Sequence, residues 1–84
     1  MTIENQIPTP PVLLDSIEQQ WIGRAKTQNI VPNKTMTKGY LNAEGEFFIG
    51  AMATLGALGY VVPPRWLIPI MSGRPIVSME RLRA

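Results

Sequence analysis

The apolar residues in the first third of the chain recur with a helical period. They stand at Leu14, Ile17, Trp21 and Ala25, with Leu13 and Ile22 beside them. Spacings of three and four residues place these side chains on one stripe of an α-helix. The pattern therefore predicts an amphipathic helix over residues 12–28. Residues 1–11, which include Pro8, Pro10 and Pro11, are expected to form an extended arm before it.

One acidic residue interrupts this stripe. Glu18 projects between Leu14 and Trp21, near the apolar side of the helix rather than opposite it. A carboxylate at such a position needs a cation or access to water, because burying an unpaired charge is costly. We expect Glu18 to lie at the edge of the stripe and to reach water, with a functional charge as the alternative.

A second helix is predicted over residues 43–58, AEGEFFIGAMATLGAL. Asn42 is the expected N-cap, Glu44 and Glu46 would oppose the positive end of the helix dipole, and Gly59 would end the helix in a left-handed conformation. A hairpin over residues 40–49 is the alternative. The helix is preferred because the pattern continues well beyond the length of a strand.

The two sides of this second helix differ in size. Phe48, Met52 and Leu55 form a bulky face that is expected to pack on the first helix and on Trp66. The small-residue face consists of Gly50, Ala53, Thr54 and Ala57. Glycine inside a helix costs up to about 1 kcal/mol relative to alanine, so these positions indicate the close approach of another backbone. That backbone belongs either to the last helix of the same chain or to a second copy in a homodimer.

The remaining segments complete a mainly α fold. Residues 29–42 are predicted to form a long loop, and a third helix containing Pro69 is expected between Pro64 and Gly73. Residues 77–84 are expected to form a basic C-terminal tail with a last helical turn capped by Ser78. The expected architecture is a small three-helix domain over residues 12–76, with an extended N-terminal arm.

Composition argues against catalysis. The 84 residues include no cysteine and no histidine, so thiolate chemistry and the commonest near-neutral general base are both missing. Glu44 and Glu46 lie two residues apart and point to different sides of a helix, which argues against a paired-carboxylate site. We predict a cytoplasmic protein that is not an enzyme and has no cofactor or metal site.

A low content of charge suggests that part of the surface is covered. Charged residues make up 17% of the chain, below the average for soluble domains, so a partner protein, a second copy or lipid is expected to cover part of it. The candidate contact residues, in the loop and toward the C-terminus, are Lys34, Lys38, Tyr40, Arg74, Arg81 and Arg83. Another protein is the expected partner.

Two other functions remain open. A small DNA-binding regulator would use the same basic residues, although no recognition helix is evident. A membrane-embedded subunit would use the uncharged residues 47–64, although Gly59 and the two following prolines oppose a continuous span.

Residues 46–75 also carry a resemblance. The succession EFFIGAMATLGALGY, then VPPRW, then SGRP is similar to small uncharacterised accessory proteins encoded by bacteriophages and other mobile elements. The resemblance implies stoichiometric binding to a host machine, as inhibitors of defence systems such as anti-CRISPR proteins do. It identifies no site residue.

Overall fold

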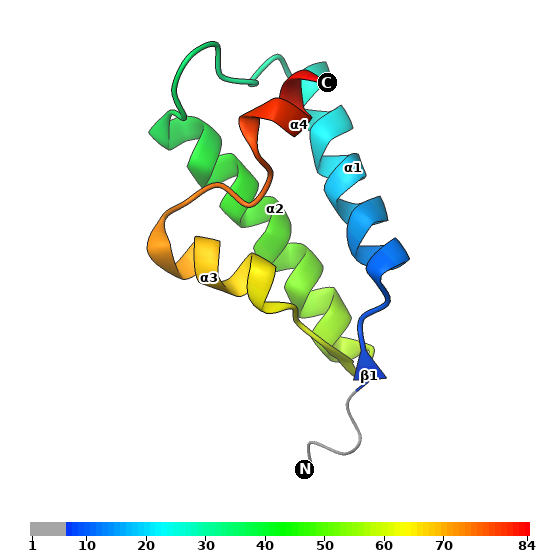
Figure 1. Cartoon of the computed structure of the whole chain (residues 1–84). Helices are drawn as coiled ribbons and strands as arrows, with labels where there is room; N and C mark the ends of the chain where they lie inside the picture. Colours follow the sequence, from blue (N-terminus) through cyan, green and yellow to red (C-terminus); the bar gives the residue numbers. More distant parts are fainter. Residues whose placement is uncertain (1–6) are drawn as a thin grey trace.

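The computed structural model describes residues 7–84, which form two short strands and four helices (Figure 1). In chain order these elements are β1 (Ile7–Pro8), α1 (Pro11–Thr27), α2 (Lys38–Ala57), β2 (Tyr60–Val61), α3 (Pro64–Ser72) and α4 (Met79–Arg83). The predicted mainly α class is therefore confirmed. Residues 1–6 of the predicted arm lie outside the described residues.

The helices surround one apolar core. Helices α1 and α2 run in opposite directions, α3 lies across α2, and the chain then returns across α2 to place α4 against α1 (Figure 1). Phe48 and Trp66 are fully buried at the centre, with ring centroids 5.0 Å apart in an edge-on arrangement. Such a pair contributes about 0.5 to 1.5 kcal/mol beyond its area burial. The predicted packing of the bulky α2 face on Trp66 is confirmed.

Helix α1 ends close to its predicted end. Asn29 has a φ of 57°, and the backbone N–H of Ile30 donates to the carbonyl of Ala25 at 3.0 Å. This pattern is a Schellman motif, with asparagine in the left-handed position that glycine most often occupies. The motif turns the chain into the loop that leads to α2.

Helix α2 begins at Lys38, earlier than the sequence predicts. The hydroxyl of Thr37 accepts a hydrogen bond from the backbone N–H of Tyr40 at 3.1 Å, so Thr37 rather than Asn42 caps the helix. The connecting loop is correspondingly shorter, at residues 28–37. The hairpin alternative over residues 40–49 is wrong, because these residues are helical throughout.

The ends of α2 and α3 follow the glycine signals. Gly59 after α2 and Gly73 after α3 have φ values of 88° and 66°, in the left-handed region that glycine adopts without strain.

Beyond Gly59, β2 pairs in parallel with β1, and Ile7 lies opposite Tyr60. The Thr9 hydroxyl also donates to the carbonyl of Val61 at 2.6 Å, which fastens the described part of the arm.

The C-terminal residues belong to the core. Val77 and Leu82 are buried, and α4 contacts α1. Ser78 caps α4 as predicted, with its hydroxyl accepting from the backbone N–H of Arg81 at 3.3 Å. Residues 77–84, which the sequence set apart as a basic tail, therefore help to close the domain.

None of the helices within residues 7–84 combines the length and the apolar character that crossing a membrane requires.

Candidate functional site

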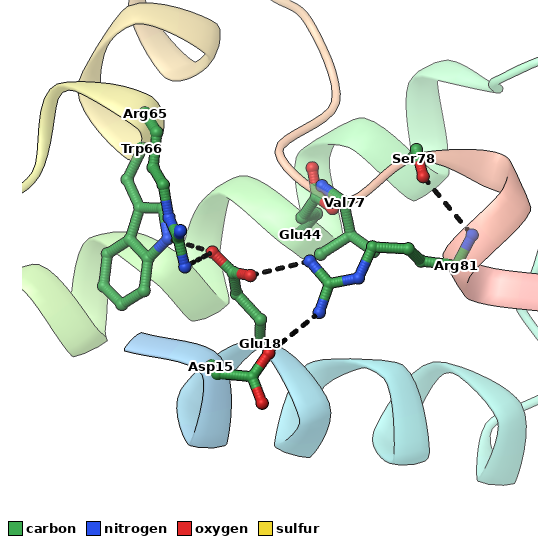
Figure 2. A network of polar contacts seen from close by, with 8 residues as sticks. All are labelled: Asp15, Glu18, Glu44, Arg65, Trp66, Val77, Ser78 and Arg81. Atoms are coloured by element: carbon green, nitrogen blue, oxygen red, sulfur yellow. Dashed lines mark hydrogen bonds and ion pairs between the residues drawn. The ribbon is translucent and has the colours of Figure 1, made fainter. Parts of the chain in front are cut away.

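A buried carboxylate joins α1 to the second half of the chain. Glu18 is 3% exposed, and Figure 2 shows it between Trp66 and Arg65 on one side and Arg81 on the other. Its oxygens accept from the Trp66 indole at 2.7 Å and the Arg81 guanidinium at 2.7 Å, and they pair with Arg65 at 2.9 Å. Arg81 also reaches Asp15 at 3.5 Å. Glu18 therefore fastens both α3 and α4 to α1.

The expectation that Glu18 reaches water is wrong. Burial pushes the pKa of Glu18 upward, but hydrogen bonds from Arg81 and Trp66 and the positive charge of Arg65 outweigh it. The pKa of Glu18 therefore lies below its usual value, and the carboxylate stays ionised inside the protein. The cations come from segments far along the sequence, so the helical projection of residues 12–28 could not show them.

A second carboxylate, Glu44, is 2% exposed and is held by neutral donors. It accepts from the backbone N–H groups of Ile76 at 2.7 Å and Val77 at 3.2 Å, and from the Tyr40 hydroxyl at 3.0 Å. The Trp21 indole in turn donates to the Tyr40 oxygen at 2.8 Å. Glu44 is thus an internal anchor for the segment before α4 and not the helix-start charge that the sequence predicts, because α2 begins at Lys38.

Burial has the largest effect on the pKa of Glu44. Burial raises the pKa of Glu44 despite the hydrogen bonds from Ile76, Val77 and Tyr40, and the negative charge of Glu18 adds to the rise. Burial likewise raises the pKa of Tyr40, and the nearby Glu44 increases it further. Within residues 7–84, every buried side-chain nitrogen and oxygen has a hydrogen-bond partner. The polar interior is therefore used to hold the fold together.

The structure separates the predicted contact residues into two groups. Tyr40 is 2% exposed and cannot contact a partner, so its assignment to the surface is wrong. Arg81 is paired with Glu18, and the Arg83 guanidinium donates to the carbonyl of Pro32 at 3.3 Å. Lys34, Lys38 and Arg74 are exposed and form no ion pair within residues 7–84, and they make up the second group.

Lys38 and Arg74 both line a cleft between α2 and α3, which we call the α2–α3 cleft. It has a volume of about 570 Å³. Its apolar lining comes from Leu41, Ile49, Pro69 and Ile70. Its charged lining consists of the two cations and the acidic residues Glu44 and Glu46. Because the cleft exists only where α3 crosses α2, the sequence alone could indicate the two cations but not their meeting.

The small-residue face of α2 is exposed at Gly50, Ala53, Thr54 and Ala57. A Cβ atom built at Gly50 would meet nothing within 4 Å, so the expectation that the last helix of the chain lies there is wrong. Gly50 and Thr54 instead line a shallow apolar groove between α1 and α2, and the Thr54 hydroxyl donates to the Gly50 carbonyl at 3.0 Å. The homodimer through this face stays a prediction.

No cluster of acidic side chains within residues 7–84 could hold a metal ion. Comparison of the chain with protein-family models, with curated proteins and with solved structures gave no match.

Proposed function

We propose that this protein is a non-enzymatic binding module that acts by occupying a surface of a partner protein. The observation that carries the proposal is the α2–α3 cleft, an open and mainly apolar hollow with the cations Lys38 and Arg74 in its lining. Binding sites are commonly concave and apolar, with a few polar groups that fix orientation. The buried carboxylates Glu18 and Glu44 are engaged in the fold, which leaves binding as the role that the surface supports best.

Exposed apolar side chains on α2 and α3 add support. Ile49 lines the cleft and is 55% exposed, while Ile68 and Met71 on the short helix α3 are 60% and 82% exposed. Single exposed apolar residues are ordinary on protein surfaces. Ile68 and Met71, however, are spaced by three residues and are neighbours on one helix face. A partner protein would cover this apolar surface.

The resemblance of residues 46–75 to phage accessory proteins indicates what kind of partner the protein binds. We propose that the partner is a host machine in the bacterial cytoplasm and that binding inhibits it, as an anti-CRISPR protein would. A DNA-binding regulator is the weaker proposal, because Arg81 and Arg83 are engaged within the fold and add little to a phosphate-binding surface.

Affinity purification from a bacterial lysate tests the proposal, with mass spectrometry to identify partners and light scattering to measure stoichiometry. The expected result is one host protein or complex bound in a fixed ratio, absent from a purification with the tag alone. Recovery of no protein partner, together with a salt-sensitive shift of DNA by the purified chain, would contradict it.

A further inference from the structure

The floor of the α2–α3 cleft contains a glycine that the fold does not require. Gly45 lies inside α2 and lines the cleft between Leu41 and Ile49, which are four residues away on either side. A Cβ atom built on Gly45 would meet nothing within 4 Å. Glycine weakens a helix relative to alanine, and here no close packing within residues 7–84 requires it. The missing side chain leaves room for a side chain from outside.

The charges around this space are placed to receive an anion. Lys38 is the first residue of α2, where it adds to the positive end of the helix dipole, and no acidic residue stands in that first turn. Arg74 follows α3 and is exposed. Neither cation forms an ion pair with any residue in the described range 7–84.

Two acidic residues adjoin the same cleft. Glu44 is one of the lining residues, but it is 2% exposed and its oxygens are already bonded to Tyr40, Ile76 and Val77. Glu46 also lines a neighbouring hollow that contains Arg24 of α1, so it stands on the edge of the cleft toward α1. The part of the cleft between Lys38 and Arg74 therefore favours negative charge.

We propose that the α2–α3 cleft binds a short acidic segment of the partner protein that carries a bulky apolar side chain. The apolar side chain fills the space above Gly45, between Leu41, Ile49 and Ile70. Carboxylates on either side of it pair with Lys38 and Arg74. This inference rests on the proposed function and specifies the chemistry of the partner.

A nucleic acid fits the same cleft less well. Phosphate backbones are bound by rows of cations, whereas the lining of this cleft offers only two. The apolar side chains of Leu41, Ile49 and Ile70 gain little from a phosphate chain but are covered by an apolar side chain. Charge and apolar surface together therefore favour an acidic protein segment.

Selection from a library of random short peptides tests the inference. The peptides that bind the wild-type protein are sequenced and then measured by fluorescence anisotropy against four variants. Gly45→Leu fills the cleft without changing charge, and Gly23→Leu is its control, because Gly23 is also a helical glycine with nothing within 4 Å and lies outside the cleft. The double variant Lys38→Glu with Arg74→Glu reverses the charge, and Lys26→Glu is the control at an exposed residue of α1 outside the cleft.

We expect the selected peptides to combine acidic residues with a bulky apolar residue. Both cleft variants should weaken their binding by roughly tenfold or more, whereas both controls should change it less than about twofold. Circular dichroism confirms that each variant is folded. Selected peptides that lack acidic residues, equal weakening by cleft and control variants, or no selected peptide at all would overturn the inference. Binding of a duplex oligonucleotide that Gly45→Leu abolishes would overturn it in favour of nucleic acid.

The double variant also separates this inference from the proposed function. If the double variant and Gly45→Leu still capture the same host protein from a lysate as the wild type does, the partner binds elsewhere and only the inference fails. If the wild-type protein captures none, the proposed function fails.

Discussion

The indole N–H of Trp66 donates a 2.7 Å hydrogen bond to the carboxylate of Glu18, which precedes it by 48 residues. The same carboxylate accepts from Arg81, so one acidic side chain on α1 holds α3 and α4 in place (Figure 2). Removing one partner of a buried charge leaves the others uncompensated, which is why such groups weigh heavily in stability.

Glu18→Gln should destabilise the protein by about 2 to 3 kcal/mol, because the amide loses the charge that Arg65 and Arg81 neutralise and offers one acceptor oxygen instead of two. Urea denaturation followed by circular dichroism measures the free energy of unfolding. Asp15→Asn is the matched control. Asp15 contacts the same arginine at 3.5 Å, but its side chain is 65% exposed, so a loss below about 0.5 kcal/mol is expected. Equal losses in the two variants would contradict the role of Glu18.

The two buried carboxylates should give opposite responses to pH. The pKa of Glu18 lies below its ordinary value of 4.5, so its contribution to stability is present at neutral pH and is lost as pH falls through the folded-state pKa. The pKa of Glu44 lies above 4.5, so its contribution is present in acid and is lost as pH rises through its folded-state pKa.

Denaturation curves at a series of pH values test this difference. The free energy of unfolding of the wild type minus that of Glu18→Gln should fall as the solution is acidified from neutral pH. The free energy of unfolding of the wild type minus that of Glu44→Gln should rise over the same range. If both differences change in the same direction, the two pKa values are not shifted in opposite directions.

Leu82→Ala should lower the free energy of unfolding by about 2 to 4 kcal/mol, because Leu82 is 1% exposed and its removal leaves a cavity in the core. Glu80→Ala, at an exposed position in the same short helix, should change it by less than about 0.5 kcal/mol. Thermal unfolding monitored by circular dichroism ranks the two variants. If Leu82→Ala leaves thermal unfolding unchanged, α4 does not contribute to the core.

Self-association through the small-residue face is a separate prediction. The wild-type protein should have twice the monomer mass in light scattering, and Ala53→Leu should reduce it to the monomer mass because the larger side chain keeps the two α2 backbones apart. Gly23→Leu, on α1, serves as the control and should leave the mass unchanged. A wild-type protein that is already monomeric would rule the dimer out.

The local signals in the sequence predicted the helical elements well. The spacing of apolar residues located α1, and Gly59, Gly73 and Ser78 marked where α2 and α3 end and α4 begins. These features depend on a few adjacent residues, so no tertiary information was needed. The start of α2 was missed because Asn42 and Thr37 are both suitable caps, and packing of Tyr40 in the core decides between them.

The polar interior was harder to predict, because its partners come together only in the folded chain. Glu18 was recognised as a charge near the apolar stripe, but it was expected to reach water, because its partners Arg65 and Arg81 lie on other helices. The spacing of Tyr40 and Glu44 by four residues was a usable signal for a hydrogen-bonded pair on one helix face. Burial of Glu44 beneath Ile76 and Val77 had no comparable signal. For the same reason the sequence indicated Lys38 and Arg74 as separate contact residues but did not indicate the cleft that both of them line.

The anchoring of the last helix to the first has a consequence for how the chain folds. A hairpin of α1 and α2 alone would carry Glu18 without its arginines and Glu44 without the N–H groups of Ile76 and Val77. Such a partial structure also lacks Trp66, Val77 and Leu82, so it buries only part of the apolar core. We therefore expect folding to be all-or-none, with no populated intermediate that lacks α4.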